Sequence, residues 1–194
     1  MNIGKTLYIT ERREWRKWLS KNHDKEKEIW LIYYKKDSGI PRISYDDAVL
    51  EALCFGWIDS IVKGIDEEKF AQRFSPRKKS SVLSQLNLER IRELIKENKM
   101  TDVGIMALSH VYDPKNDKVE DFKIPEGILK SIKKNEKAWE NFQKLPESYK
   151  RVRISYIESR KRHSTGMYQK ALSNFVKATE KNKRIGFVKE RHEK

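Results

Sequence analysis

The sequence predicts an α+β fold, in which a small, mainly antiparallel sheet of about three or four strands is covered by helices and followed by an all-helical module. Three observations lead to this prediction. Segments with strand character all lie in the first 76 residues, helical apolar spacing dominates the later part, and a charged segment with few apolar residues separates the two. We therefore expect a core domain at 1–111, a linker at 112–124, a helical module at 125–182 and a frayed basic tail at 183–194.

Length and composition indicate a folded protein without a membrane span. A chain of 194 residues can bury about 70% of its unfolded surface. Its five Trp, eight Tyr and seven Phe are too many for a disordered chain, although 37% of the residues are charged. No apolar run is long enough to cross a bilayer and no signal-peptide core is present, so we expect a cytoplasmic protein. Nothing in the sequence indicates an oligomeric state.

The first predicted elements are a helix and a buried strand. Thr10 can cap a helix that ends near Asn22 and carries Trp15 and Leu19 on one face. The run EIWLIYYKK at 28–36 combines aromatic and β-branched residues and contains no Gly or Pro. That composition predicts a buried strand, which the following Asp-Ser-Gly sequence ends.

A further helix and two strands follow. Ser44, with an aspartate three positions later, resembles a capping box and predicts a helix that stops at a glycine. The segment WIDSIVKGID at 57–66 alternates as a strand does, which would place Asp59 and Ile61 on the same face. A second alternating segment at 69–75 predicts a strand that pairs with the previous one in antiparallel orientation.

Every later element is predicted to be helical. The serine-rich segment 80–84 opens one helix, and Thr101 can cap the next. After the charged linker, Pro125 and Pro146 suit the first positions of two more helices. Apolar residues at 167–176 stand at helical spacing and predict a last amphipathic helix.

The positive charge is concentrated in the C-terminal third. The net charge is +14, and residues 126–194 contribute 19 Lys and Arg against 8 Asp and Glu. Such a basic surface attracts anionic partners, so nucleic acid is one candidate partner. A solvated lysine-rich surface that serves only solubility is the alternative. The candidate phosphate contacts are Arg151, Arg153, Arg160, Lys161 and Arg162.

The most informative part of the sequence is the segment 52–87, where Asp59 lies on an apolar strand. A buried carboxylate needs a hydrogen bond, an ion pair or water. Arg73 and Arg77 are its candidate partners, and an ion pair that fixes the following loop is the structural interpretation. In the functional interpretation, Asp59 orients Arg77 so that its guanidinium binds a small anionic ligand or partner. In this interpretation the ligand lies in a cleft. Trp57 would form one side of the cleft, and the side-chain amide of Asn87 would hydrogen-bond the ligand.

Other chemistry has weaker support in the sequence. Cys54 lies at a helix end between apolar residues, which is typical of a structural, unreactive thiol. As the single cysteine it excludes an intramolecular disulfide and a multi-cysteine zinc site. The sequence FSPRKKSS stands before a helix start, where backbone amides favour anions, but it contains no P-loop. A third hypothesis is an enzyme that uses Asp59 as a base. It ranks last because the sequence contains no cofactor or metal motif.

The segments ALCFGWIDS, FSPR and LIKENKMTDVG, together with the C-terminal IPEGILKSIKKNEKAWENFQKLPESYK, resemble the bacterial and archaeal YdeI/OmpD-associated family, also labelled bacteriocin-protection proteins. The resemblance extends over nearly the whole chain. It implies a small cytoplasmic protein linked by name to envelope stress and bacteriocin tolerance, with no catalytic mechanism to transfer. The chain departs from the family at Leu83, where a Trp is usual, and at 164–167, where the family is more basic.

Overall fold

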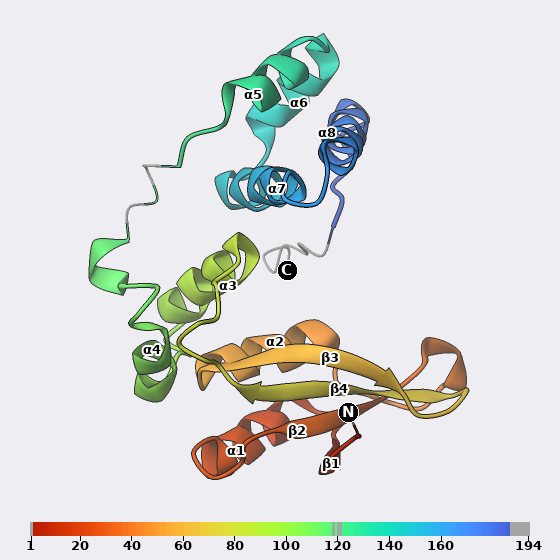
Figure 1. Cartoon of the computed structure of the whole chain (residues 1–194), viewed down its shortest axis with the longest axis vertical. Coiled ribbons are helices and arrows are strands. Elements are labelled where there is room, and N and C mark those ends of the chain that lie inside the picture. The colour runs from red at the N-terminus through yellow and green to blue at the C-terminus, as the bar shows by residue number, and fades with distance from the viewer. Residues whose placement is uncertain (1, 118, 120–121, 187–194) are drawn as a thin grey trace. The chain divides into compact units, whose positions relative to one another are not determined.

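The computed structural model describes residues 2–117, 119 and 122–186 and confirms the predicted α+β class (Figure 1). In this part of the chain, helices separate and follow the strands of a single four-stranded sheet. The sheet therefore belongs to the N-terminal part, and the described residues of the C-terminal part are helical, as the sequence predicts.

The chain divides into two compact units. The first, here called the N-terminal unit, contains the residues up to Leu83 together with Arg90–Asp117. The second, here called the C-terminal unit, contains Ser84–Glu89 together with the chain beyond Asp117. Each unit has its own cluster of buried apolar residues.

The strands of the sheet are arranged in the order β1-β2-β4-β3. Three of them correspond to the predicted strands and pair in antiparallel orientation: β2 (Ile29–Tyr34), β3 (Trp57–Gly64) and β4 (Lys69–Pro76). The fourth, β1 (Thr6–Tyr8), runs parallel to β2 and was not predicted. Its three residues are too few to show a recognisable alternation in the sequence.

A β-bulge changes the alternation of side chains along β3. Asp59 pairs with Phe74, and Val62 pairs with Gln72. Because Phe74 and Gln72 stand two residues apart on β4, they share a face of the sheet, and Asp59 and Val62 therefore share it too. The prediction that Ile61 lies on the same face as Asp59 is wrong for this reason.

Helices α1 (Arg12–Asn22) and α2 (Tyr45–Cys54) pack against one face of the sheet. The predicted end of α1 is confirmed, but its N-cap is Glu11 rather than Thr10, in a capping box with the glutamate of the first turn. The predicted cap of α2 is confirmed, since the hydroxyl of Ser44 accepts the N–H three residues later.

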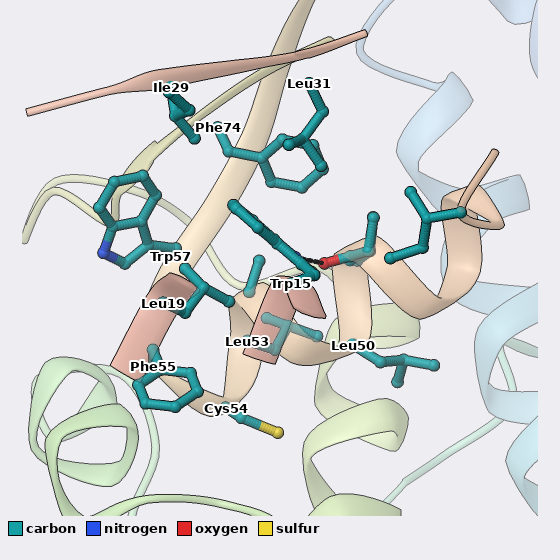
Figure 2. Packing of buried hydrophobic residues seen from close by; sticks show 14 of the residues in the cluster. Trp15, Leu19, Ile29, Leu31, Leu50, Leu53, Cys54, Phe55, Trp57 and Phe74 are labelled. Carbon is teal, nitrogen blue, oxygen red and sulfur yellow. Dashed lines mark hydrogen bonds between the residues drawn. The ribbon is translucent and has the colours of Figure 1, made fainter. Parts of the chain in front are cut away.

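Trp15 lies at the centre of the core between the sheet and these two helices (Figure 2). Its indole N–H donates to the carbonyl of Ala48 at 2.9 Å, so the buried ring has a polar partner on α2. The ring stacks on Trp18 at 5.2 Å between centroids and meets Phe74 of β4 edge-on at 5.5 Å. These contacts join α1, α2 and the sheet in one core.

Helices α3 (Gln85–Lys96) and α4 (Asp102–Leu108) both begin at capping hydroxyls. Ser84, the last residue of the predicted serine-rich segment, accepts the backbone N–H of Asn87 at 3.3 Å. Thr101 accepts the N–H three residues later at 3.1 Å, which confirms the predicted cap of α4.

The C-terminal end of α2 and the start of α4 are in close contact. The backbone N–H and the hydroxyl of Thr101 both donate to the carbonyl of Cys54, at 3.1 and 2.6 Å. A Cβ atom added to Gly104 would lie 2.1 Å from the same carbonyl oxygen. Gly56 has a left-handed backbone with φ of 72°, and an added Cβ would lie 2.4 Å from Cβ of Ala107. The structure therefore explains why both positions, in the FGW and DVG sequences, are glycine.

The C-terminal unit contains four helices, α5 (Glu126–Lys133), α6 (Glu136–Lys144), α7 (Glu147–Arg160) and α8 (Thr165–Glu180). Both α5 and α7 follow a proline directly. The expected amphipathic spacing of α8 is present, since its buried positions recur at helical intervals. The largest buried side chains of this core are Ile128, Ile132, Phe142, Tyr149, Ile154, Ile157 and Phe175.

The chain after α8 returns to α7. Tyr149 donates its hydroxyl to the carbonyl of Ile185 at 3.2 Å and accepts the N–H of the same residue at 2.8 Å. The first residues of the predicted tail are therefore anchored up to Ile185. Residues 187–194 of that tail, and residues 118, 120 and 121 of the predicted linker, lie outside the described residues.

The Gly104→Ala substitution should lower the free energy of unfolding of the N-terminal unit by about 3 kcal/mol, because the added methyl group collides with a backbone carbonyl that cannot move aside. Gly64→Ala is the matched control, since an added Cβ there meets nothing within 4 Å. Chemical denaturation followed by tryptophan fluorescence measures both variants. Equal stability of the two variants would contradict the close helix contact.

Candidate functional site

Trp57, a predicted ligand contact, is a core residue. It is 1% exposed, and its ring meets Trp18 of α1 edge-on at 5.8 Å between centroids. Its indole N–H donates to the carbonyl of His23 at 3.2 Å. The ring lies among the buried side chains of the N-terminal unit in Figure 2. Its polar atom and its apolar surface are both satisfied within the fold, so we do not include it in the candidate site.

Asp59 accepts a hydrogen bond from the hydroxyl of Tyr45 at 2.7 Å. The expected ion pair with Arg73 or Arg77 is not found among the described residues. Arg73 instead binds Glu28 through two nitrogens, at 2.8 and 2.7 Å. The carboxylate on β3 is therefore held by a neutral partner on α2, and no cation of the described chain neutralises it.

Arg77 lies directly after β4 and is 8% exposed. Its backbone N–H donates to the carbonyl of Gly56 at 2.9 Å, which fixes the residue against the turn between α2 and β3. One guanidinium nitrogen, Nη1, donates to the carbonyls of Ser81 and Val82 at 3.3 Å each. The other, Nη2, is buried and has no hydrogen-bond partner.

The charge of Arg77 is not compensated within the described part of the chain. Burial lowers the pKa of Arg77, and no carboxylate opposes this effect. Removing an ion from water costs several kcal/mol unless partners replace the lost hydration. The next residues, Lys78 and Lys79, add two exposed positive charges to the same loop. The loop is thus a place where an anion would lower the electrostatic free energy.

Asn87, the fourth predicted ligand contact, belongs to the segment Ser84–Glu89 that groups with the C-terminal unit. Its backbone N–H forms part of the N-terminal cap of α3. The other three predicted residues, Trp57, Asp59 and Arg77, belong to the N-terminal unit. There Trp57 lies in the core, Asp59 lies on β3 and is bound by Tyr45 of α2, and Arg77 lies in the loop after β4.

Sequence reasoning missed an aromatic pair on β2 and β4 that is covered by an arginine. Tyr33 on β2 stacks on Phe70 of β4 with ring centroids 5.3 Å apart. The guanidinium of Arg42 lies over both rings, 5.7 Å from the first centroid and 6.0 Å from the second. The hydroxyl of Tyr33 is buried and has no hydrogen-bond partner. The only sequence signal for this group is the strand alternation, which places the tyrosine on the same face as the core.

A buried charge network in the N-terminal unit was also missed. Glu51 on α2 is 2% exposed, and Arg12 and Arg16 of α1 bind its two oxygens at 2.5 and 2.7 Å. Arg16 also donates to the carbonyl of Lys99 at 3.0 Å. The carboxylate of Glu51 is thus bound through both oxygens, although Nη2 of Arg12 is buried without a hydrogen-bond partner. Because each of these arginines has a carboxylate partner, the network joins α1 to α2 and is interpreted as structural.

Cys54 is a buried free thiol, which agrees with the structural interpretation. Burial raises the pKa of Cys54 to about 11, and the negative charge of Glu51 acts in the same direction. Arg16 opposes this shift only in part. A thiol that stays protonated and out of solvent is a poor nucleophile.

The five predicted phosphate contacts of the C-terminal unit have different surroundings. Arg151 forms a two-nitrogen ion pair with Glu89, which belongs to the same unit, at 2.7 and 2.9 Å. Lys161 pairs with Glu158 at 2.8 Å. Arg153 is 8% exposed and lies over the ring of Tyr156 at 4.7 Å. The side chains with solvent contact and no carboxylate partner among the described residues are Arg160 and Arg162.

The described residues contain neither a metal site nor a membrane span. In 2–117, 119 and 122–186, no three His, Cys, Asp or Glu side chains are placed to hold a metal ion. In the same part of the chain, no helix has the length and apolar character to cross a membrane.

Two family models match the chain. Residues 7–107 match a domain of unknown function, DUF8412. Residues 121–182 match the model described as Bacteriocin-protection, YdeI or OmpD-Associated, which confirms the sequence resemblance over the C-terminal part. The central segments that contributed to the resemblance lie inside the first match instead. No curated protein and no solved structure matches the chain significantly.

The Glu51→Gln substitution should lower the free energy of unfolding by about 3 kcal/mol, because it leaves two arginines without their shared counter-ion. Lys5→Met removes the exposed ion pair with Glu26 and serves as the control, with an expected loss below about 1 kcal/mol. Urea denaturation measures both variants. A loss for Glu51→Gln no larger than that of the control would show that the network contributes little.

Cys54 in the native chain should react with a thiol reagent at pH 8 at least about 100-fold more slowly than in the chain unfolded in guanidinium, because the thiolate is both scarce and buried. Release of the thionitrobenzoate chromophore measures the two rates. Native and unfolded rates of the same size would contradict the buried position and would reopen a nucleophilic role.

Proposed function

Because the chain belongs to the family of that domain of unknown function, which matches about half of it and names no activity, we propose from the geometry that the N-terminal unit binds a small anion. The anion is held by Arg77 and the loop that follows it. We propose that this binding serves bacteriocin protection, because the C-terminal part matches a family model described by that role. We further propose that the protein acts in the cytoplasm.

A single observation carries the proposal: Arg77 is a buried cation with an unpaired nitrogen, Nη2, and no counter-ion among the described residues. Its two bonds to loop carbonyls are 3.3 Å long, which is near the upper limit for a hydrogen bond. An oxyanion would form shorter, charge-assisted bonds with the same guanidinium. The exchange of carbonyls for an anion is therefore favourable for this side chain.

The loop supplies further groups suited to an oxyanion. Lys78, Lys79 and Ser80 are exposed beside Arg77, and the backbone turns between Lys78 and Ser81 through a 2.9 Å hydrogen bond. Two ammonium groups and hydroxyl groups can bind oxygens that the guanidinium leaves free. Phosphate and carboxylate groups both fit this set of donors.

Nucleic-acid binding through the C-terminal unit has weaker support. Two of the five expected contacts, Arg151 and Lys161, are already paired with carboxylates. Arg153 is buried with its Nε unpartnered, as Nη2 of Arg77 is, but it lies over the ring of Tyr156, whereas Arg77 stands directly before the exposed Lys78 and Lys79. The excess of positive charge in this unit is thus partly used within the fold. The buried, unpaired guanidinium after β4 is a more specific feature than this general charge.

The Arg77→Gln substitution should weaken the binding of inorganic phosphate at least about tenfold, because it removes a charge-assisted donor pair. The melting temperature of the ligand-free chain should change little, since the removed charge has no counter-ion. Isothermal titration calorimetry measures the affinity, and differential scanning calorimetry measures the stability.

Arg73→Gln is the control, because this arginine lies on β4, four residues before Arg77, and is neutralised by Glu28. It should leave the phosphate affinity unchanged. Three results would contradict the proposal: no phosphate binding by the natural chain, equal affinity of Arg77→Gln and the natural chain, or a large stability loss in Arg77→Gln. The last result would assign Arg77 a structural role.

A further inference from the structure

We propose that Tyr33, Arg42, Tyr45 and Asp59 form a second binding site in the N-terminal unit, and that this site takes a small zwitterion such as a free amino acid. The carboxylate of the ligand would bind Arg42, and its ammonium group would bind Asp59. This site is independent of the anion site at Arg77, because it uses other residues and another ligand chemistry.

Arg42 provides the positive side of the site. Its guanidinium lies over the stacked rings of Tyr33 and Phe70, and the side chain is partly exposed. A guanidinium over an aromatic face keeps the N–H groups of its edge available for an oxyanion. No carboxylate of the described residues binds it, so its charge can be neutralised by a ligand.

Asp59 provides the negative side. One of its oxygens, Oδ2, accepts the hydroxyl of Tyr45 at 2.7 Å, and no cation of the described residues pairs with it. The carboxylate is partly buried, and Tyr45 is 40% exposed. A carboxylate in this position favours an ammonium group, which can donate to the second oxygen.

The hydroxyl of Tyr33 is a buried polar group of the site that lacks a hydrogen-bond partner. Tyr33 is 1% exposed, and its hydroxyl has no hydrogen-bond partner in the described chain. An unsatisfied buried hydroxyl lowers the stability of the fold. The pKa of Tyr33 is raised, first by burial and then by Tyr45, while Arg42 lowers it and Asp59 raises it. Among these residues, the contact that the structure places on Tyr33 is the guanidinium of Arg42 over its ring.

The other charges near the site are already neutralised. Asp46, the neighbour of Tyr45 at the start of α2, pairs with Arg90 at 2.7 Å. The uncompensated charges are one cation, Arg42 over the ring of Tyr33, and one anion, Asp59, which is bound by the hydroxyl of Tyr45 three residues after Arg42. A ligand with one charge would leave the opposite charge unpaired, whereas a zwitterion satisfies both. The ring of Phe70 adds an apolar wall for a side chain of the ligand.

The test is a titration of the full-length, isotopically labelled chain with glycine, serine and leucine, followed by amide chemical shifts. Methylammonium and acetate serve as the matched probes with a single charge. At least one amino acid should bind at least about tenfold more tightly than either single-charge probe, with shifts centred on residues near Tyr33 and Asp59.

Three variants and two controls identify the contacts. Arg42→Gln and Asp59→Asn should each weaken amino-acid binding at least about tenfold, and Tyr33→Phe should weaken it about fivefold. Lys69→Gln removes a cation that lies over another ring, that of Tyr34, at 5.8 Å and should have no effect. Asp66→Asn, which changes an exposed carboxylate between β3 and β4, should also have no effect. Arg77→Gln should leave amino-acid binding intact, which separates this site from the anion site.

Several results would overturn the inference. If none of the amino acids changes the spectrum, the Tyr33 hydroxyl is served by water and the site takes no zwitterion. Equal binding of acetate with no effect of Asp59→Asn would show a plain anion site, and equal binding of methylammonium with no effect of Arg42→Gln would show a plain cation site. Unchanged amino-acid affinity in all three variants would place the binding elsewhere.

Discussion

The contact between the end of α2 and the start of α4 determines where both candidate sites lie. The last carbonyls of a helix need donors from outside it, and Cys54 receives two from Thr101. Gly104 allows α4 to approach the same carbonyl, and Gly56 turns the chain from α2 into β3 through a left-handed backbone. The carbonyl of Gly56 then accepts the N–H of Arg77. The start of β3 and the end of β4 are thereby fixed together, and with them the charged groups that each strand carries.

The N-terminal unit treats its buried charges in two different ways. Glu51 is bound by two arginines, and Arg92 forms a two-nitrogen ion pair with Asp117 at 2.7 and 2.6 Å. The sequence is therefore able to pair charges where it buries them. Arg77 and the hydroxyl of Tyr33 are also buried and keep unsatisfied atoms. Nη2 of Arg12 is unsatisfied too, but that guanidinium has carboxylate partners, whereas Arg77 has none among the described residues and the Tyr33 hydroxyl has no hydrogen-bond partner. Since such atoms reduce stability, the places that retain them are the places where a bound molecule would add the most favourable free energy.

The fold follows from the sequence wherever the determining contact is local. Ser44 and Thr101 cap their helices as predicted, because a cap depends on a hydroxyl and a backbone N–H three residues apart. The position of Ile61 was wrong because the bulge in β3 arises from pairing with β4, which the strand's own alternation does not contain. Strand β1 escaped prediction for the same reason, since its three residues become a strand only beside β2.

The sequence identified two charged residues that the fold leaves without a counter-ion among the described residues, but it assigned their contacts wrongly. The carboxylate of Asp59 and the guanidinium of Arg77 were selected because charged residues flanked by apolar ones are costly to bury, and both are indeed left without a counter-ion among the described residues. The prediction that they form an ion pair with each other is wrong. The hydrogen-bond partner of Asp59 is Tyr45, which lies on another element. Arg42 has no local motif at all, and only the stacking of two rings from different strands gives it a position. A single sequence therefore indicates which charges need partners, whereas the identity of the partners depends on contacts between distant segments. For the same reason, the groups that find no partner, on which the two proposed sites depend, become visible only in the folded chain.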